Sequence, residues 1–170
     1  TIEITVSLIV PSSGGGTGGG GFIIPPATPA IPAGSGVSIN YTQSGETVTL
    51  DMPDSKINEI INSAKDGTVV IDASEVSGAT DIEMSKSALT KLADAGLDVK
   101  INLPQGDVTR DADAAKSVAA QAGGSSVKIT VKEVSQSSLT KEQRAAINPN
   151  DLVFDITVMS DSQVIHNFDG

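Results

Sequence analysis

The strongest constraint on this chain is a break in composition between residues 11 and 36. The stretch PSSGGGTGGGGFIIPPATPAIPAGSG contains nine Gly and five Pro in 26 residues. Such a segment buries too little surface to offset its ordering entropy, so we expect flexibility through the Gly run and an extended course from Pro25 to Pro32. The break predicts three parts: a segment at residues 1–10, a tether at residues 11–36 and a folded module at residues 37–170.

The ten residues before the tether, TIEITVSLIV, have the period of a β-strand. Large apolar side chains alternate with Glu3, Thr5 and Ser7, which gives the segment one apolar face. An isolated strand is unstable in water, so this one needs a sheet to join. That sheet belongs to the same chain, to a neighbouring copy or to a preceding domain. The apolar positions of the predicted assembly strand are Ile2, Ile4, Val6, Leu8 and Val10.

The tether contains no charged residues. No Asp, Glu, Lys or Arg occurs from Ile4 to Gly45, although solvated linkers usually contain charged residues. Within it, Phe22, Ile23 and Ile24 form an apolar cluster of a kind that seldom faces water without a binding partner. We therefore expect these three residues to contact another surface.

The remaining module alternates strand-like and helix-like segments, which predicts an α+β domain: a small mixed or antiparallel sheet with about four short helices. Ser85 and Asp111 are the expected N-caps of two of these helices, and Gly96 is an expected helix stop. Strands are expected at residues 37–41, 47–52, 68–72, 81–84, 98–103, 107–109, 126–134, 152–159 and 163–168, and helices at residues 54–64, 85–95, 112–122 and 138–146.

Composition argues against several classes of function. A net charge of -10 disfavours binding to nucleic acid or to anionic lipid through a basic patch. The absence of Cys excludes disulfides, thiolate nucleophiles and Cys-ligated metals. No apolar run reaches the ~18 residues of a membrane span, so we expect no membrane insertion. The one histidine, His166, has no G-x-S-x-G motif to serve. We expect neither an enzyme nor a bound cofactor.

Patterns that suggest a binding site have simpler explanations. The glycine run contains a formal G-x-G-x-x-G match, but no helix follows it to hold a pyrophosphate. Asp107, Asp111 and Asp113 suit calcium, yet they lack EF-hand spacing and serve equally well at a helix start. The run from Asn150 to Asp155 fits a turn and an exposed strand position. We predict no metal site.

Part of the module resembles a known family. The stretch MSKSALTKLADAGLDVKINLPQGDVTRDADAAKSVAAQAGGSSVKITVKEV, followed by NPNDLVFDITVMSDSQVIHNFDG, combines a helix of the form hxxLxxLxxAG, a P-x-G-x-V hairpin, an Ala-rich helix and a V-x-h-x-V strand. These features are similar to a module of exported surface proteins of Gram-positive bacteria, found near S-layer homology repeats and bacterial Ig-like domains. The resemblance runs from about Val69 to Gly170 and implies an extracellular building block without catalytic residues.

The resemblance also bears on the first strand. In the proteins that the chain resembles, the F-x-G corner, here Phe168–Gly170, is followed by one more alternating strand. The given sequence stops at that corner, and its first eleven residues look like the missing strand. The strand then either folds back into its own domain or enters a neighbouring copy by donor-strand complementation. A third arrangement makes it the last strand of an upstream domain.

These observations together predict an extracellular or cell-surface structural subunit of a bacterial assembly, either a filament or a layer. Its copies are expected to form a homo-oligomer through exchange of the N-terminal strand. The alternative is a spacer module of a larger exported protein that binds the cell wall or another protein.

Overall fold

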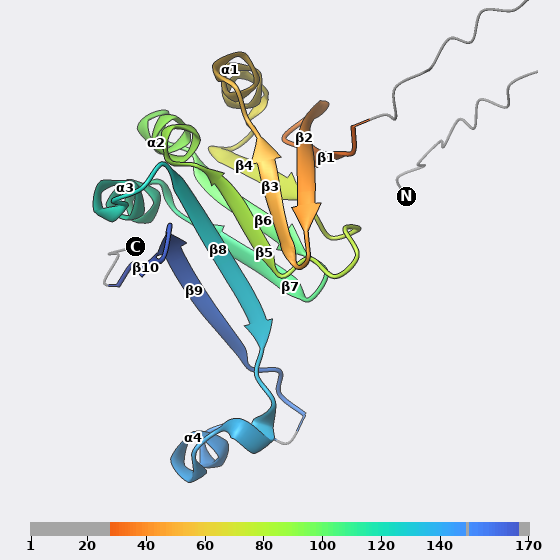
Figure 1. The fold of residues 1–170 in the computed structure, drawn as a ribbon, viewed down its shortest axis with the longest axis vertical. Coiled ribbons are helices and arrows are strands. Elements are labelled where there is room, and N and C mark those ends of the chain that lie inside the picture. Colours follow the sequence, from red (N-terminus) through yellow and green to blue (C-terminus); the bar gives the residue numbers. More distant parts are fainter. Residues whose placement is uncertain (1–27, 149, 167–170) are drawn as a thin grey trace, which may run out of the picture.

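The computed structural model describes residues 28–148 and 150–166, and it confirms the α+β class. These residues form one ten-stranded mixed sheet that curls into a half-barrel, together with four α-helices (Figure 1). The strands are β1 (Ala30–Ala33), β2 (Val37–Ser44), β3 (Thr47–Asp51), β4 (Thr68–Asp72), β5 (Asp81–Ser85), β6 (Asp98–Leu103), β7 (Gly106–Arg110), β8 (Ser126–Glu133), β9 (Phe154–Ser160) and β10 (Gln163–Val164). The helices are α1 (Asp54–Ser63), α2 (Lys86–Asp94), α3 (Ala112–Gln121) and α4 (Lys141–Ala145), with a 3-10 turn, η1, at Gln136–Ser138.

The sheet is larger than the sequence predicts, because every strand of the described chain joins it. Its order is β10-β9-β8-β5-β3-β2-β1-β4-β6-β7. Two neighbouring pairs, β3 with β5 and β4 with β6, are parallel, and the other pairs are antiparallel. Strand β1 lies between β2 and β4 and so joins the two halves of the sheet.

Strand β1 corrects the predicted tether boundary. Its residues, AIPA, belong to the Pro-rich part that composition assigns to an extended linker, so the sheet begins at Ala30 and not at residue 37. Ile31 and Ala33 are buried in the core, whereas the two residues between and before them are exposed. Two inward side chains are too few to stand out as a strand pattern in a Pro-rich sequence.

A proline is tolerated inside this strand for a geometric reason. The carbonyl of Pro29 accepts the N–H of Tyr41 on β2 at 3.0 Å, whereas the N–H of Gly34 donates to Val70 on β4 at 2.9 Å. Because backbone groups alternate sides along a strand, Pro32 directs its missing donor toward β4. Pairing between β1 and β4 is limited to one residue pair, so little is lost there.

The core lies inside the curled sheet and is closed by helices at one end. Along β6 and β8, buried apolar residues alternate with partly exposed polar ones, as expected for strands with one covered face. Helices α1, α2 and α3 lie together at the end of the sheet opposite α4 (Figure 1). Both predicted caps are confirmed, because Ser85 accepts the N–H of Ala88 and Asp111 accepts the N–H of Ala114. The stop at Gly96 is confirmed by its φ of 71°.

The last predicted helix, over residues 138–146, is wrong in its extent. The structure has only η1 and the single short helix α4, whose residues are all exposed. These two elements lie within residues 134–148 and 150–153, which form a projection at the far end of β8 and β9 (Figure 1). This projection is named the α4 lobe. None of the helices in the two described ranges is long and apolar enough to cross a membrane.

Candidate assembly edge

The residues predicted to drive assembly lie outside the described part of the chain. They are Ile2, Ile4, Val6, Leu8 and Val10 of the assembly strand, and Phe22, Ile23 and Ile24 of the tether. Their pairing and their contacts stay predictions. The structure describes the sheet formed by residues 28–148 and 150–166.

The aspartates considered for calcium have other partners. Asp107 forms an ion pair with Lys100 at 2.8 Å, Asp111 caps α3, and Asp113 lies in the first turn of that helix. Burial lowers the pKa of the adjacent Arg110, and the charge of Asp111 opposes this shift. Within residues 28–148 and 150–166, no group of three or more His, Cys, Asp or Glu side chains could hold a metal ion.

The predicted turn before β9 is present. The backbone N–H of Asp151 donates to the carbonyl of Asn148 at 3.1 Å, and the Asp151 carboxylate accepts the backbone N–H of Asn148 at 2.8 Å and its side-chain amide at 3.1 Å. Asp155 is exposed on β9, as predicted, and His166 is exposed after β10. These polar residues have structural explanations.

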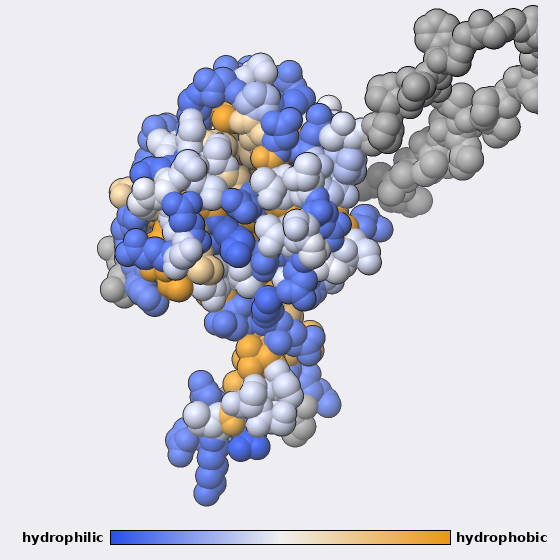
Figure 2. Space-filling view, viewed as in Figure 1, coloured by the Kyte–Doolittle hydropathy of each residue, from blue (hydrophilic) through white to orange (hydrophobic). Residues whose placement is uncertain are grey.

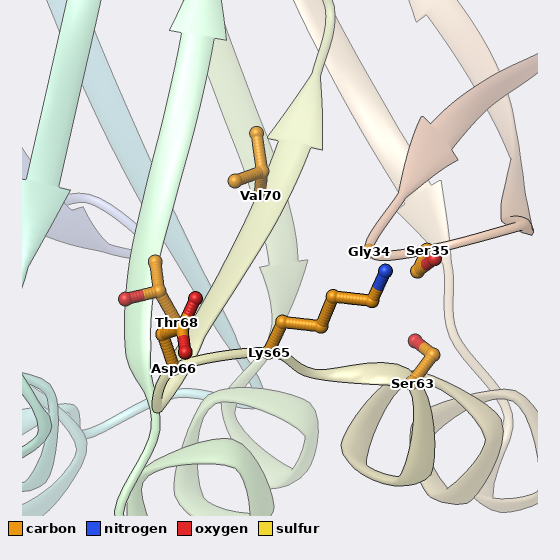
Figure 3. A pocket seen from close by; sticks show the side chains of 7 residues that line it. All are labelled: Gly34, Ser35, Ser63, Lys65, Asp66, Thr68 and Val70. Atoms are coloured by element: carbon orange, nitrogen blue, oxygen red, sulfur yellow. The ribbon is translucent and has the colours of Figure 1, made fainter.

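A cavity of about 370 Å³ lies between the β1–β2 turn, the end of α1 and the start of β4 (Figure 3). The side chain of Lys65 extends across it toward Gly34 and Ser35. The hydroxyl of Ser63 donates to the carbonyl of Ile60 at 2.9 Å, so its proton is directed to its own helix. A serine nucleophile needs a hydrogen bond to a base instead. The cavity therefore gives no support for catalysis.

The sheet leaves part of one edge uncovered. Strand β10 pairs with only the last two residues of β9. One more hydrogen bond, from the N–H of Ile165 to the carbonyl of Val158 at 2.8 Å, continues this contact. Among the described residues, no strand pairs with residues 154–157 on the side away from β8.

Two hydrogen bonds show which way the backbone of β9 faces. The N–H of Val134 donates to the carbonyl of Val153 at 2.8 Å, so Val153 faces β8, whereas the carbonyl of Val158 faces the opposite side. In an antiparallel ladder, the N–H and C=O of one residue point to the same side, and the side alternates along the strand. Phe154 and Ile156 therefore direct their backbone groups away from β8, toward the open edge.

Uncovered apolar side chains lie along the same stretch. In the described part of the chain, the exposed large hydrophobic residues are Leu152 at 66 %, Ile156 at 46 % and Val164 at 39 %. Val158, on the same face of β9 as Ile156, is only 1 % exposed. Phe154, the next residue on this face, is partly buried against the core, so the uncovered side chains are those of Ile156 and Leu152 near the α4 lobe, where Figure 2 shows apolar surface at the neck. The segment Leu152–Thr157 is named the β9 edge.

The surface is hollowed beside the β9 edge and at the end of this edge nearest the α4 lobe. One cavity of about 350 Å³ is lined by residues 155–158 and 164–166. A second, of about 690 Å³, lies at the neck of the α4 lobe and is lined by residues 133–136 and 150–153. These hollows leave room beside the β9 edge for the side chains of an added strand.

Lys132 and Asp155 lie on the outer face of the sheet near the β9 edge, whereas Glu133, which is paired with Phe154, lies on the other face. Lys132 is paired across the ladder with Asp155 and forms an ion pair with Glu46 at 3.0 Å. The hydrogen bond and charge of Glu46 raise the pKa of Lys132, and the charge of Asp81 adds to this shift. The opposite, core-facing side of β9 presents Ile156. An added strand would therefore meet the apolar Ile156 on that side, with the charged Glu133 closer to the α4 lobe.

The other end of the sheet is protected. On β7, the apolar residue Val108 is buried, and its neighbours Asp107 and Thr109 are exposed and polar. Edge strands of soluble proteins usually present polar or charged side chains, which discourage pairing with another chain. The β9 edge departs from this rule and β7 follows it.

Comparison of the chain with protein-family models, with curated proteins and with solved structures gives no match. The assignment of a function therefore depends on the β9 edge itself. Sequence reasoning missed this edge, because the alternation of Phe154, Ile156 and Val158 predicts a strand with one buried face along its whole length. Ile156 is uncovered where β10 ends at Val164, whereas the sequence predicts a strand over residues 163–168, of which residues 167 and 168 lie outside the described part of the chain.

Proposed function

We propose that this chain is a non-catalytic structural subunit of an extracellular bacterial surface assembly, a filament or a layer, whose copies associate through the N-terminal strand. The observation that carries the proposal is the β9 edge, where outward-facing backbone groups lie beside the uncovered side chains of Leu152 and Ile156. An open edge of this kind is a template for pairing with another chain. The placement at the cell surface rests on the sequence resemblance.

The distribution of charge supports association through the N-terminal arm. Glu3 is the only charged side chain before Glu46, so nearly all of the net charge of -10 belongs to the folded body. Bodies of like charge repel one another at long range. An arm that is almost uncharged can approach the acidic body of another copy without that penalty.

Sedimentation velocity across micromolar to millimolar concentrations tests this proposal. The full chain is expected to associate, and electron microscopy then distinguishes a filament from a layer. Val6→Lys, which places a charge on the apolar face of the assembly strand, is expected to abolish association. Ser7→Lys, on the polar face of the same strand, is the matched control and is expected to associate like the parent. A monomeric parent, or equal behaviour of the two variants, contradicts the proposal.

A second candidate function is recognition of the cell wall or of another surface protein, as a spacer in a larger exported protein. The α4 lobe favours it, because this lobe projects from the body and carries the neck cavity with Leu152 exposed beside it (Figures 1 and 2). Incubation with purified cell wall, followed by centrifugation, tests this function. Protein that stays entirely in the supernatant counts against wall binding.

A further inference from the structure

We propose that residues Ile2–Val10 of one copy dock on the β9 edge of a neighbouring copy as an added strand. The inference rests on the proposed function and identifies the acceptor surface for its assembly strand. It rests on the agreement between two features that lie far apart in the sequence. One is the N-terminal segment, whose alternating pattern is typical of a strand that pairs with a sheet. The other is the edge of β9, whose outward backbone groups have no partner strand among the described residues.

The two surfaces match in the alternation of their side chains. Neighbouring strands of a sheet place paired residues on the same face, so an added strand has one face toward the core and one toward solvent. On the acceptor, Ile156 lies on the core-facing side and Asp155 and Thr157 on the outer side. On the donor, the apolar row from Ile2 to Val10 can continue the core-facing side, while Glu3, Thr5, Ser7 and the single apolar residue Ile9 face outward.

The donor segment is long enough to cover the whole β9 edge. The β9 edge has six residues and is about 20 Å long, and a nine-residue strand is about 30 Å long. The surplus of about three residues would continue beside the neck of the α4 lobe, where the cavity of about 690 Å³ lies. The uncovered side chain of Leu152 is at this end of the edge.

The position of β1 permits docking between copies as well as docking within one copy. Five strand spacings separate β1 from β9 in the sheet order, about 24 Å along the curled surface. The 19 residues between Val10 and Ala30 have a typical end-to-end distance of about 24 Å, which equals that separation. Docking on its own sheet is within reach of the tether, but the tether would have to cross β2, β3, β5 and β8 and continue toward the far end of β9, where the α4 lobe departs (Figure 1). A neighbouring copy imposes no such crossing.

The arrangement has a consequence for the shape of the assembly. The donor strand and the acceptor edge are different surfaces, so the contact is heterologous, or head to tail. Each docked copy keeps its own β9 edge free for the next copy. Such a contact propagates into an open filament unless the rotation between copies closes a ring.

Mixing two complementary variants of the full chain tests the inference. Val6→Lys leaves the β9 edge unchanged but places a charge on the apolar face of the donor strand. Ile156→Lys leaves the donor strand unchanged but places a charge on the β9 edge. Each variant alone is expected to be a monomer, and an equimolar mixture is expected to give a one-to-one complex in sedimentation. Thr109→Lys, an exposed position on the opposite edge strand β7, is the matched control and is expected to associate like the parent.

A second measurement covers the case in which Ile156→Lys does not fold. A fluorescent peptide of residues 1–11 is expected to bind the Val6→Lys protein, and unlabelled peptide is expected to displace it. Absence of peptide binding overturns the inference.

The outcomes separate this inference from the proposed function. A parent chain that never associates refutes both. A parent that associates, together with an Ile156→Lys variant that associates equally well, refutes the β9 edge as acceptor and leaves the proposed function standing. Two monomeric variants that form no complex on mixing refute docking between copies, as expected if the chain's own strand or the residues after His166 fill the edge.

Discussion

Replacement of Ile31 by Ala tests whether the folded body includes β1. Ile31 is 4 % exposed and lies opposite Ile39 on β2, in a strand that joins the two halves of the sheet. If the Pro-rich segment were only a linker, this substitution would have almost no effect on stability. If β1 is part of the core, the substitution leaves a cavity in the middle of the sheet.

The expected magnitude follows from burial. Replacing a buried Ile by Ala usually costs about 2 to 5 kcal/mol in the free energy of unfolding, so we expect about 3 kcal/mol for Ile31→Ala. The same substitution at Ile156, which is 46 % exposed, removes about half as much buried surface and leaves no closed cavity. We expect about 1 kcal/mol or less for Ile156→Ala in the monomer.

Urea unfolding at a low, fixed protein concentration measures both changes with association suppressed. Circular dichroism gives the midpoint, and thermal unfolding should show Ile31→Ala about 10 °C below the parent for a domain of this size. Equal destabilisation by the two substitutions would refute the placement of Ile31 in the core. It would restore the tether boundary near residue 37.

Two further predictions concern local contacts. Ser85→Ala removes the side chain that accepts the N–H of Ala88 and should lower the free energy of unfolding by about 1 kcal/mol in urea titrations; an unchanged midpoint would contradict the capping role. The raised pKa of Lys132 means that its ion pair with Glu46 stabilises the fold below the ordinary lysine pKa and is lost as pH rises through the raised value. Glu46→Gln should therefore weaken the alkaline decline in stability above about pH 10, and an identical pH profile would contradict this pairing.

Local signals in the sequence located many elements of the fold correctly. The caps at Ser85 and Asp111 and the stop at Gly96 depend on neighbours within four residues, which a sequence displays directly. Strand β1 depends instead on pairing with β2 and on a contact with β4 almost forty residues away, and its composition favours a linker. Its boundary was wrong for that reason.

The candidate site likewise combines a feature that local sequence reveals with one that depends on tertiary structure. The sequence predicts that residues 1–10 need a partner strand, because their alternation is visible without any structure. It does not reveal the β9 edge, because Ile156 differs from Val158 only in what covers it. Coverage is decided by the end of β10 and the departure of the α4 lobe, both of which are tertiary features.

Amide hydrogen exchange at Ile156 tests the central claim most directly, because its backbone N–H faces away from β8 toward the open edge. In the Val6→Lys variant, this amide is expected to exchange rapidly, and in the associated parent it is expected to be protected by the docked strand. The amide of Ile129, on the interior strand β8, should exchange equally slowly in both and serves as the control. Equal exchange at Ile156 in the variant and in the associated parent would contradict assembly through the β9 edge.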